Sequence, residues 1–213
     1  MYSLDQVVTS RDKFYFFKYF TELNKKMLSI NNQSLFYHYH GSPWYEWPVH
    51  FKGIVYFWQD INDEEHILVY LFGNPIIYWT ALLSVILSTF FLLSKLVRFS
   101  SFSQLDKGIS LCVFGYFVNW LPYYYIGRTT YIYHYHPSLY FAIILIGLLF
   151  DKISRTLHVS SKIVNNITKI LFVLLMLSII YSYFFFLPFS YALPLTDEAH
   201  ESRRWFKAIL PYW

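Results

Sequence analysis

Four long apolar stretches lie in the chain beyond residue 74, and their lengths predict how it is built. They have 18 to 20 residues each and cover residues 75–93, 108–126, 131–150 and 170–187. At about 1.5 Å per residue, a helix of this length crosses a hydrocarbon core of about 30 Å. The pattern therefore predicts an all-α integral membrane protein with about four transmembrane helices, contained in a membrane domain at residues 37–213.

Two prolines bear on where predicted spans begin. Pro75 follows Asn74, and proline at the first helical position beside a capping residue is typical of a helix start. Pro137 lies inside the third apolar stretch. Because the stretch from Pro137 to residue 150 has only 14 residues, the third span either begins before the proline and kinks there, or its first turns lie outside the bilayer.

The segments before the first span are too polar to cross a membrane. Residues 1–36 mix charges with aromatic residues, which predicts an amphipathic helix on the membrane surface. Residues 37–49 contain two prolines, a glycine and several Trp and Tyr, as expected for an ordered loop at the headgroup level. Residues 51–59 are expected to form a short amphipathic helix, residues 60–65 an acidic loop, and residues 188–195 an extended exit after the last span.

Composition agrees with a membrane protein and argues against a nucleic-acid-binding protein and against a protein held by disulfides or thiol-bound metal. Apolar residues make up 56% of the chain and aromatic residues 23%, and the mean hydropathy is +0.33. The net charge of +4 does not indicate nucleic-acid binding, because the basic residues cluster beside the apolar stretches as topology signals do. The single cysteine, Cys112, lies within an apolar stretch, so no internal disulfide and no thiol-metal site is expected.

The distribution of basic residues predicts the orientation. The loop between the first two spans has three, the loop between the last two has four, and the middle loop has only Arg128. By the positive-inside tendency, the two basic loops face the cytoplasm. Arg128, the tryptophan-rich loop, the acidic loop and the C-terminal tail then share the outer or lumenal side. A glycosylation sequon at Asn32 would also lie there, and its occupancy would indicate the endoplasmic reticulum.

The polar stretch at residues 127–140 is the candidate for chemistry. Arg128 follows a glycine near the expected start of a helix, where backbone N–H groups and a guanidinium together favour a phosphate. His134 and Tyr135 return to the same side if the segment is helical, and they are candidates to complete a lipid-phosphate site. The alternative is that Arg128 extends to the headgroups while the Tyr and His residues form an aromatic belt.

Other readings of the same residues are weaker. His134 and His136, like His38 and His40, have no third ligand near in sequence, so no metal site is expected. A hydrolase built on Ser138 would need an orienting acid such as Glu46 and a strained nucleophile turn, for which there is no sequence signal.

Three blocks at compatible spacing carry a family resemblance. They are SPWYEWP at residues 42–48, GRTTYIYHYHP at 127–137 and LPFSYALPL at 187–195, supported by GNP at 73–75 and RRW at 203–205. Together with four spans, they resemble the C-terminal four-helix region of the protein O-mannosyltransferases. The resemblance implies the C-terminal half of a GT-C glycosyltransferase, and in this family the enzyme transfers mannose from dolichyl or polyprenyl phosphate to Ser and Thr hydroxyls of acceptor proteins.

The resemblance also implies roles for individual residues, and the chain differs from the family in some respects. Arg128, His134 and Tyr135 match family positions and become candidates for binding the donor-lipid phosphate, although Tyr133 replaces a second histidine that the family often has. The family's catalytic acid lies in its N-terminal half, so no catalytic residue and no cofactor is expected in this chain. It would then be a truncated product, a split subunit that works with an N-terminal half or partner, or a degenerate copy. The alternatives are a non-catalytic membrane subunit or a related transferase, in the endoplasmic reticulum membrane or a bacterial plasma membrane.

Overall fold

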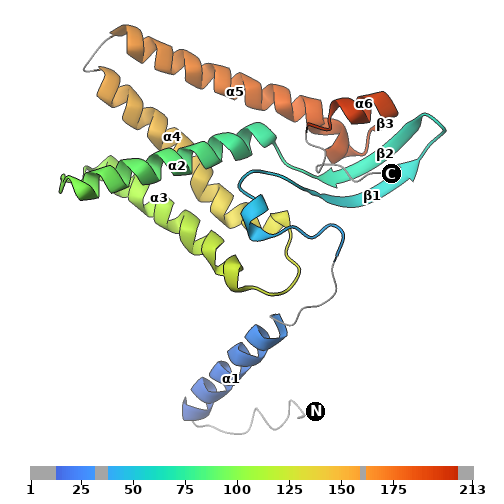
Figure 1. Ribbon diagram of the computed structural model, residues 1–213, viewed down its shortest axis with the longest axis horizontal. Coiled ribbons are helices and arrows are strands. Elements are labelled where there is room, and N and C mark those ends of the chain that lie inside the picture. Colours follow the sequence, from blue (N-terminus) through green and yellow to red (C-terminus); the bar gives the residue numbers. More distant parts are fainter. Residues whose placement is uncertain (1–12, 32–37, 159–161, 206–213) are drawn as a thin grey trace.

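The computed structural model describes residues 13–31, 38–158 and 162–205 of the 213-residue chain, and Figure 1 shows its arrangement. Residues 1–12 and the sequon at Asn32 lie outside the described residues. The regular elements are α1 (Lys13–Asn31), η2 (Trp44–Glu46), β1 (Ile54–Asp60), β2 (Glu65–Leu71), α2 (Pro75–Val97), α3 (Gln104–Trp120), η3 (Leu121–Tyr125), η4 (Ile132–Tyr135), α4 (His136–His158), α5 (Lys162–Tyr191), β3 (Pro194–Thr196) and α6 (Asp197–Ser202).

Among the described residues, three helices are long and apolar enough to cross a membrane. Their candidate spans are Pro75–Val97, Ile132–Thr156 and Asn166–Tyr191, corresponding to α2, to η4 with α4, and to α5. The fourth helix, α3, has 17 residues and continues directly into the short 3-10 helix η3. Together α3 and η3 cover the stretch at 108–126 for which a span was expected, and its crossing of the membrane stays a prediction.

The first span begins where the sequence predicts. Asn74 is the N-cap of α2: its side chain accepts hydrogen bonds from the N–H groups of Ile76 and Ile77 at 3.1 and 3.3 Å. Pro75 occupies the first helical position, where its missing N–H leaves no donor unsatisfied. The Asn74 amide also donates to the carbonyl of Ile179 in α5 at 2.9 Å. The predicted helix start is therefore confirmed, and the same residue joins two of the long helices.

The helix α4 is the central element of the bundle. Both α2 and α3 pack against it, and α5 packs against its other side (Figure 1). Small residues are buried between α2 and α4: Ala81 and Ala142 are fully buried, and the Ser84 hydroxyl of α2 donates to the Ala142 carbonyl of α4 at 3.0 Å. Small residues and interhelical hydrogen bonds are the usual means by which membrane helices pack closely.

A small antiparallel sheet replaces the helix expected at residues 51–59. Strand β1 pairs with β2, and β2 pairs with β3 from the C-terminal tail. The helix prediction for this segment is wrong, because its run of β-branched and aromatic residues forms a hairpin with β2. In β2, Leu68 and Tyr70 alternate inward and pack with Phe186 and Phe189 of α5.

The acidic segment at 60–65 forms the hairpin turn. The predicted extended exit holds only in part, since α5 continues through Pro188 before β3 begins.

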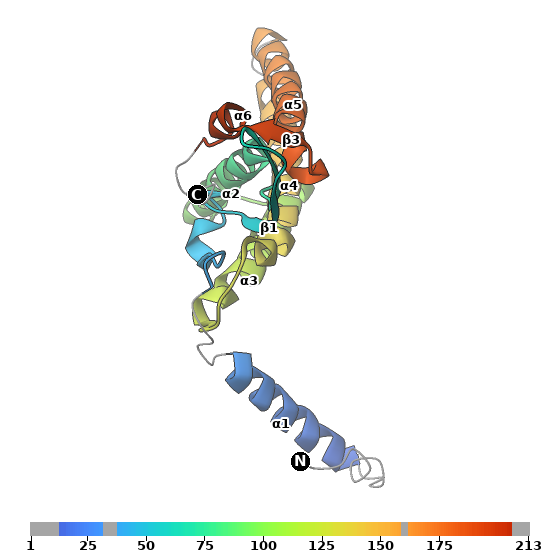
Figure 2. The ribbon, with the colours of Figure 1, turned by 90° about the vertical axis from the view of Figure 1, so that its right-hand side faces the viewer.

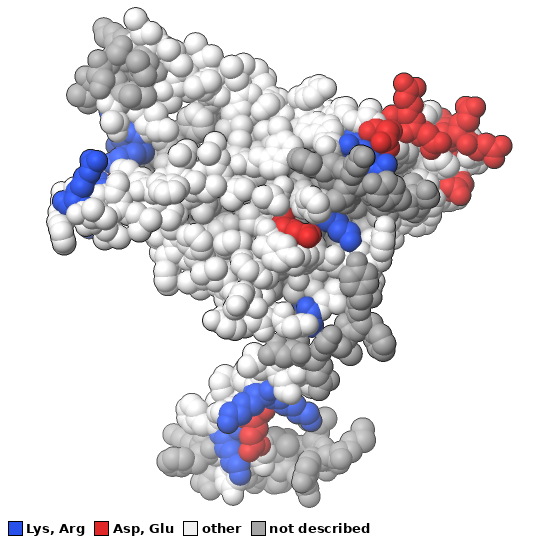
Figure 3. Space-filling view, in the orientation of Figure 1, with Lys and Arg blue, Asp and Glu red and all other residues white. Residues whose placement is uncertain are grey.

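Acidic side chains are concentrated at one end of the helical body, with some basic side chains beside them, and a cluster of basic side chains lies at the other end. Figure 3 shows acidic side chains over the β1–β2 turn and α6, and basic side chains at the opposite end, where α2 ends and α3 begins. At the basic end the fully buried carboxylate of Asp106 accepts hydrogen bonds from Lys95 of α2 at 2.6 Å and Lys152 of α4 at 2.8 Å. One buried charge therefore ties three helices together at the face expected to be cytoplasmic.

The helix α1 stands clear of the rest of the chain in Figures 1 and 2, and its described side chains, those of residues 15–30, are all exposed. Phe16, Phe20, Leu23 and Met27 recur at helical spacing on one face, with lysines on the opposite face. This pattern is typical of a helix lying in a membrane interface. The surface location expected for residues 1–36 stays a prediction.

Candidate functional site

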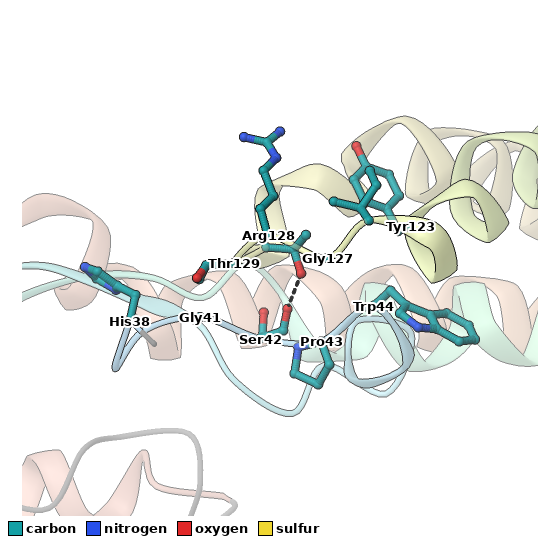
Figure 4. A pocket seen from close by; sticks show the side chains of 11 residues that line it. His38, Gly41, Ser42, Pro43, Trp44, Tyr123, Gly127, Arg128 and Thr129 are labelled. Atoms are coloured by element: carbon teal, nitrogen blue, oxygen red, sulfur yellow. Dashed lines mark hydrogen bonds between the residues drawn. The ribbon is translucent and has the colours of Figure 1, made fainter. Parts of the chain in front are cut away.

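A hollow of about 380 Å³ lies between two loops that are far apart in sequence (Figure 4). One loop precedes the sheet and the other connects η3 to η4. Of the residues that the structure describes, no acidic side chain contributes to its wall. The lining residues are His38, Gly41, Ser42, Pro43, Trp44, Tyr123, Ile126, Gly127, Arg128, Thr129 and Thr130.

Paired hydrogen bonds hold the two loops together. The Ser42 N–H donates to the Thr130 carbonyl at 2.8 Å, and the Thr130 hydroxyl donates back to the Ser42 carbonyl at 2.8 Å, which is the bond dashed in Figure 4. Gly41 allows this approach, because a Cβ there would lie 2.6 Å from the Thr129 methyl group. Ser42 and Thr130 are both buried, so these bonds are sheltered from water and the loops form one unit.

Arg128 is the charged group of this hollow. Its side chain is exposed and extends outward in Figure 4. Among the described residues, it makes no hydrogen bond or ion pair. A guanidinium without an internal carboxylate partner keeps its five donors for an external anion, and it matches the two oxygens of a phosphate in a bidentate pair. The hollow is therefore suited to bind an anionic group at its mouth.

His134 lies behind the wall of the hollow. Its ring is edge-on to Tyr123, a lining residue, at a centroid distance of 5.4 Å, and it stacks on Trp47 at 6.1 Å with an interplanar angle of 15°. The backbone N–H of Tyr131 donates to His134 Nδ1 at 3.1 Å. These contacts hold the imidazole in one orientation near the site, but the ring does not line the hollow itself.

Tyr135 is placed in the helix core. It is fully buried, and its hydroxyl lies 3.1 Å from that of Tyr116 in α3. Its ring also packs near Tyr78 of α2, at a centroid distance of 5.9 Å. The structure thus brings Arg128 and the surroundings of His134 together, while Tyr135 points between helices and its assignment to the phosphate stays a prediction.

The weaker readings gain no support from the geometry. Ser138 is fully buried, and its hydroxyl has no hydrogen-bond partner in the part of the chain that the structure describes. Within those same residues, no three His, Cys, Asp or Glu side chains lie where they could hold a metal ion. Glu46 does not line the hollow, and burial raises the pKa of its carboxyl while the charge of Lys52 opposes that shift.

Two tryptophans organise the site in a way that sequence reasoning missed. Trp47 is 1% exposed, and its indole N–H donates to the Ser42 hydroxyl at 2.9 Å. Trp44 packs edge-on against Trp120 of α3, with ring centroids 4.9 Å apart, and the Trp120 N–H donates to the Trp44 carbonyl at 2.9 Å. The sequence indicated a loop at the headgroup level, but these residues are structural anchors. The only sequence signal for them was the SPWYEWP block, which carried the family resemblance but did not indicate these contacts.

His50 anchors the same loop to the sheet and to α2. It is fully buried, its Nε2 contacts the carbonyl of Phe72, and its ring packs against Tyr78 at 4.0 Å. Burial lowers the pKa of His50 to about 4, and the contact with Phe72 opposes the shift only in part. The folded protein therefore keeps this imidazole neutral at pH values where an unfolded chain would protonate it.

We expect His50 to make the protein acid-sensitive. Because its pKa is lower in the folded state, stability should be complete above about pH 6.5 and should fall by up to about 3 kcal/mol as the pH drops toward 4. Unfolding midpoints in detergent across this range would measure the loss, and His50→Gln should flatten it. The exposed His38→Gln is the control and should keep the wild-type profile. An unchanged profile in His50→Gln would contradict the assignment.

Comparison with known proteins adds sequence and structural relatives. Residues 16–209 match the family described as the C-terminal four-transmembrane region of protein O-mannosyltransferase. Protein O-mannosyl-transferase 2 of Danio rerio is 29% identical over 184 residues, covering 78% of this chain and 24% of the relative. Dolichyl-phosphate-mannose–protein mannosyltransferase 1 of Candida albicans is 31% identical over 192 residues, covering 84% and 21%. The chain thus spans about a quarter of the length of these relatives.

A solved structure shares the fold. The protein O-mannosyltransferase Pmt1–Pmt2 complex of S. cerevisiae, solved bound to the sugar donor, superposes with a TM-score of 0.74. The similarity covers 90% of this chain and 26% of the matched chain at 23% sequence identity. The predicted fold class, a helical membrane protein resembling the C-terminal half of a GT-C glycosyltransferase, is confirmed by this match, with the small sheet as an addition that was not foreseen.

Proposed function

The chain belongs to the protein O-mannosyltransferase family, and we propose that it supplies the donor-lipid side of an enzyme that moves mannose from dolichyl or polyprenyl phosphate to Ser and Thr hydroxyls of proteins. The observation that carries this proposal is the exposed Arg128 at the mouth of the hollow, where, within the described part of the chain, Arg128 has no ion-pair partner and no acidic side chain lines the wall. Both the donor and the lipid phosphate that leaves are anions, so one cationic group can bind the donor and stabilise the leaving group.

The proposed chemistry assigns Arg128 to the leaving group. When the sugar carbon is attacked by a hydroxyl, negative charge builds on the phosphate oxygen that leaves. The donor phosphate carries one negative charge before the reaction and gains a second as the sugar leaves, so a guanidinium beside that oxygen stabilises the transition state more than the ground state. His134, held between Trp47 and Tyr123, is proposed to position the aromatic wall beside the phosphate. Tyr135 keeps its sequence-based assignment only if the helices around Tyr116 open to the site.

The acceptor hydroxyl also needs a base, and we propose that it comes from outside this chain. Among the described residues, no carboxylate lines the hollow, and a general base must reach the proton that it removes. An N-terminal half or a partner subunit would supply it. Support comes from the matched structure, which is a complex of two such proteins bound to the sugar donor, and from relatives about four times longer than this chain.

The lack of a carboxylate also supports a second candidate function. A membrane subunit that keeps the lipid-phosphate site without catalysing transfer would have the same Arg128 and the same hollow. A related GT-C transferase with another sugar or acceptor would share them too. The chain is a membrane protein in each case, and the eukaryotic origin of the quoted relatives favours the endoplasmic reticulum over a bacterial plasma membrane.

A reconstitution assay separates these possibilities. We expect the purified chain in lipid nanodiscs to bind dolichyl phosphate mannose but to transfer no mannose to a Ser/Thr acceptor peptide. Addition of the family's N-terminal half should restore transfer if the chain is part of a split enzyme and should leave it absent if the chain is a non-catalytic subunit. Robust transfer by the chain alone would contradict the external base, and absence of donor binding would contradict the function itself.

A further inference from the structure

A crevice of about 460 Å³ lies between α4 and α5, near the ends of these helices that are expected to face the cytoplasm. The two helices diverge from that end (Figure 1). The crevice is lined by Gly147, Phe150, Asp151 and Ser154 of α4 and by Thr168, Lys169, Phe172 and Val173 of α5. All of these residues lie inside the candidate membrane spans Ile132–Thr156 and Asn166–Tyr191. The crevice therefore opens to the bilayer and not to the Arg128 hollow.

The lining of the crevice changes from polar to apolar with depth in the membrane. On α4, which runs toward the expected cytoplasmic face, the polar lining residues come after the apolar ones. On α5, which runs back, the polar lining residues come first. The polar residues of both helices therefore lie at the same end, with the apolar ones deeper. A phospholipid has this polarity, because its charged headgroup lies at the interface and its acyl chains lie in the hydrocarbon core.

Gly147 leaves the deeper part of the crevice unfilled. Among the described residues, no atom beyond its own helix backbone lies within 4 Å of where a Cβ at Gly147 would be. Glycine is unfavourable inside a helix, and here no neighbouring side chain uses the space that it leaves. Gly115 of α3 differs, since a Cβ there would lie 2.6 Å from the Phe141 ring. The space at Gly147 is therefore available to a molecule from the bilayer.

The mouth of the crevice carries one negative and one positive side chain. The carboxylate of Asp151 is 41% exposed, and one of its oxygens accepts a hydrogen bond from Arg155 Nε at 2.8 Å. Lys169 is exposed and, among the described residues, is in no ion pair. Opposite charges at one mouth match the phosphate and the ammonium of a zwitterionic headgroup, whereas a headgroup with only negative charge would face the carboxylate.

We propose that the α4–α5 crevice binds one molecule of phosphatidylethanolamine from the cytoplasmic leaflet. The lipid phosphate accepts from Lys169, its primary ammonium donates to the Asp151 carboxylate, and one acyl chain passes Gly147 beside Phe150 and Phe172, whose rings lie 5.0 Å apart. The bound lipid joins α4 to α5, where direct contacts are less extensive than those of α4 with α3. This proposal goes beyond the proposed function, because the two sites share no residue.

The test compares three lipids that have the same dioleoyl chains and different headgroups. Binding of phosphatidylethanolamine, phosphatidylcholine and phosphatidylglycerol to the delipidated full chain in detergent is titrated by native mass spectrometry. The methylated ammonium of phosphatidylcholine has no N–H to donate, and phosphatidylglycerol has no ammonium. We expect phosphatidylethanolamine to bind about tenfold more tightly than either, which is the ratio that one hydrogen bond to an exposed charged group provides.

Two charge variants test the headgroup contacts. Asp151→Asn should reduce the preference for phosphatidylethanolamine to about threefold, because a neutral acceptor makes a hydrogen bond about half as strong. The variant keeps the fold, since the pair with Arg155 is on the surface. Lys169→Gln should weaken all three lipids about fivefold, because each of them has a phosphate. Lys107→Gln removes an exposed cation of α3 outside the crevice and should change none of the affinities.

A variant at Gly147 tests the place of the acyl chain. Gly147→Leu should abolish saturable binding of all three lipids, because the leucine occupies the space that the chain needs. It should fold, since a Cβ there meets no neighbour and leucine favours a helix. The control is Ile143→Phe, which adds bulk one turn away on α4, at a position that is 43% exposed and outside the crevice, and which should bind the lipids as the wild type does.

Three results would overturn the proposal. Equal affinity of the wild type for all three lipids would mean that the crevice holds ordinary bilayer lipid. Tightest binding of phosphatidylglycerol would mean that the carboxylate at the mouth does not select an ammonium. A preference for phosphatidylethanolamine that survives both Gly147→Leu and Asp151→Asn would place the lipid elsewhere on the chain.

Discussion

Replacing Asp106 by asparagine should lower the free energy of unfolding by about 3 kcal/mol. The Asp106 side chain is fully buried and accepts from Lys95 at 2.6 Å and from Lys152 at 2.8 Å, which joins α2, α3 and α4. Removing one partner of a buried ion pair typically costs about 3–5 kcal/mol. The lower value applies here because the two lysines are 20% and 26% exposed and water can partly solvate them.

Thermal unfolding in detergent measures this loss, and Asp151→Asn is the matched control. Asp151 pairs with Arg155 on the surface of α4, so its replacement should leave the unfolding midpoint unchanged. Burial alone would raise the pKa of Asp106, but the hydrogen bonds from Lys152, Lys95 and Ser103 outweigh it and hold that pKa below its usual range.

The lowered pKa fixes the expected pH dependence of the variant. A carboxylate whose pKa is depressed by folding contributes full stability above the ordinary aspartate range and loses it only as the pH falls further. The difference between wild type and Asp106→Asn should therefore be constant between about pH 5 and 8. Equal midpoints for Asp106→Asn and Asp151→Asn would show that the buried triad does not hold the helices together.

Replacing Arg128 by alanine should weaken binding of a polyprenyl phosphate mannose donor about tenfold. A hydrogen bond to a charged group contributes about 1.5–3 kcal/mol, and the lower figure is suitable because Arg128 is exposed to solvent. Arg128→Lys should lose less, since it keeps the charge but not the planar pair of donors. The wild-type affinity should also fall as salt is raised, because screening acts on exposed charges.

The control for Arg128 is an arginine at the other end of the bundle. Arg98 is exposed beyond α2, among the basic residues of the opposite face, and Arg98→Ala should leave donor affinity unchanged. Titration of each variant with fluorescent donor lipid in nanodiscs gives the comparison. If Arg128→Ala and Arg98→Ala bind the donor equally well, the headgroup role of Arg128 is wrong whatever the family membership.

Elements with a strong local signal were predictable. The start of α2 at Pro75 follows from proline chemistry and from an Asn side chain that caps the adjacent backbone, both of which act within three residues. Residues 51–59 show the opposite case. Their aromatic and β-branched composition suits a strand, but a strand also needs a partner, and that partner is β2, with β3 contributed by the tail more than 120 residues later. Local pattern did not reveal this pairing.

In the candidate site too, some residues could be predicted from the sequence and others could not. Arg128 was visible because an arginine between two apolar stretches is chemically unusual, and the structure leaves it exposed at a hollow. The helical spacing that grouped His134 and Tyr135 with it did not anticipate that a 3-10 turn, η4, would direct Tyr135 to Tyr116 in the core and set His134 against Trp47.

The sequence by itself determined that this chain is a membrane protein, where its long helices run, which family it resembles and which cation to examine. These properties follow from the composition and order of neighbouring residues, which determine the free energy of transfer into lipid and the tendency to form a local helix. Only the tertiary structure decided that the loop at Ser42 closes on Thr130, that Trp44 packs against Trp120 of α3, and that Asp106 binds lysines from two other helices. Each of these contacts joins residues separated by 11 to 88 positions, and such pairs are chosen by packing in three dimensions rather than by local preference.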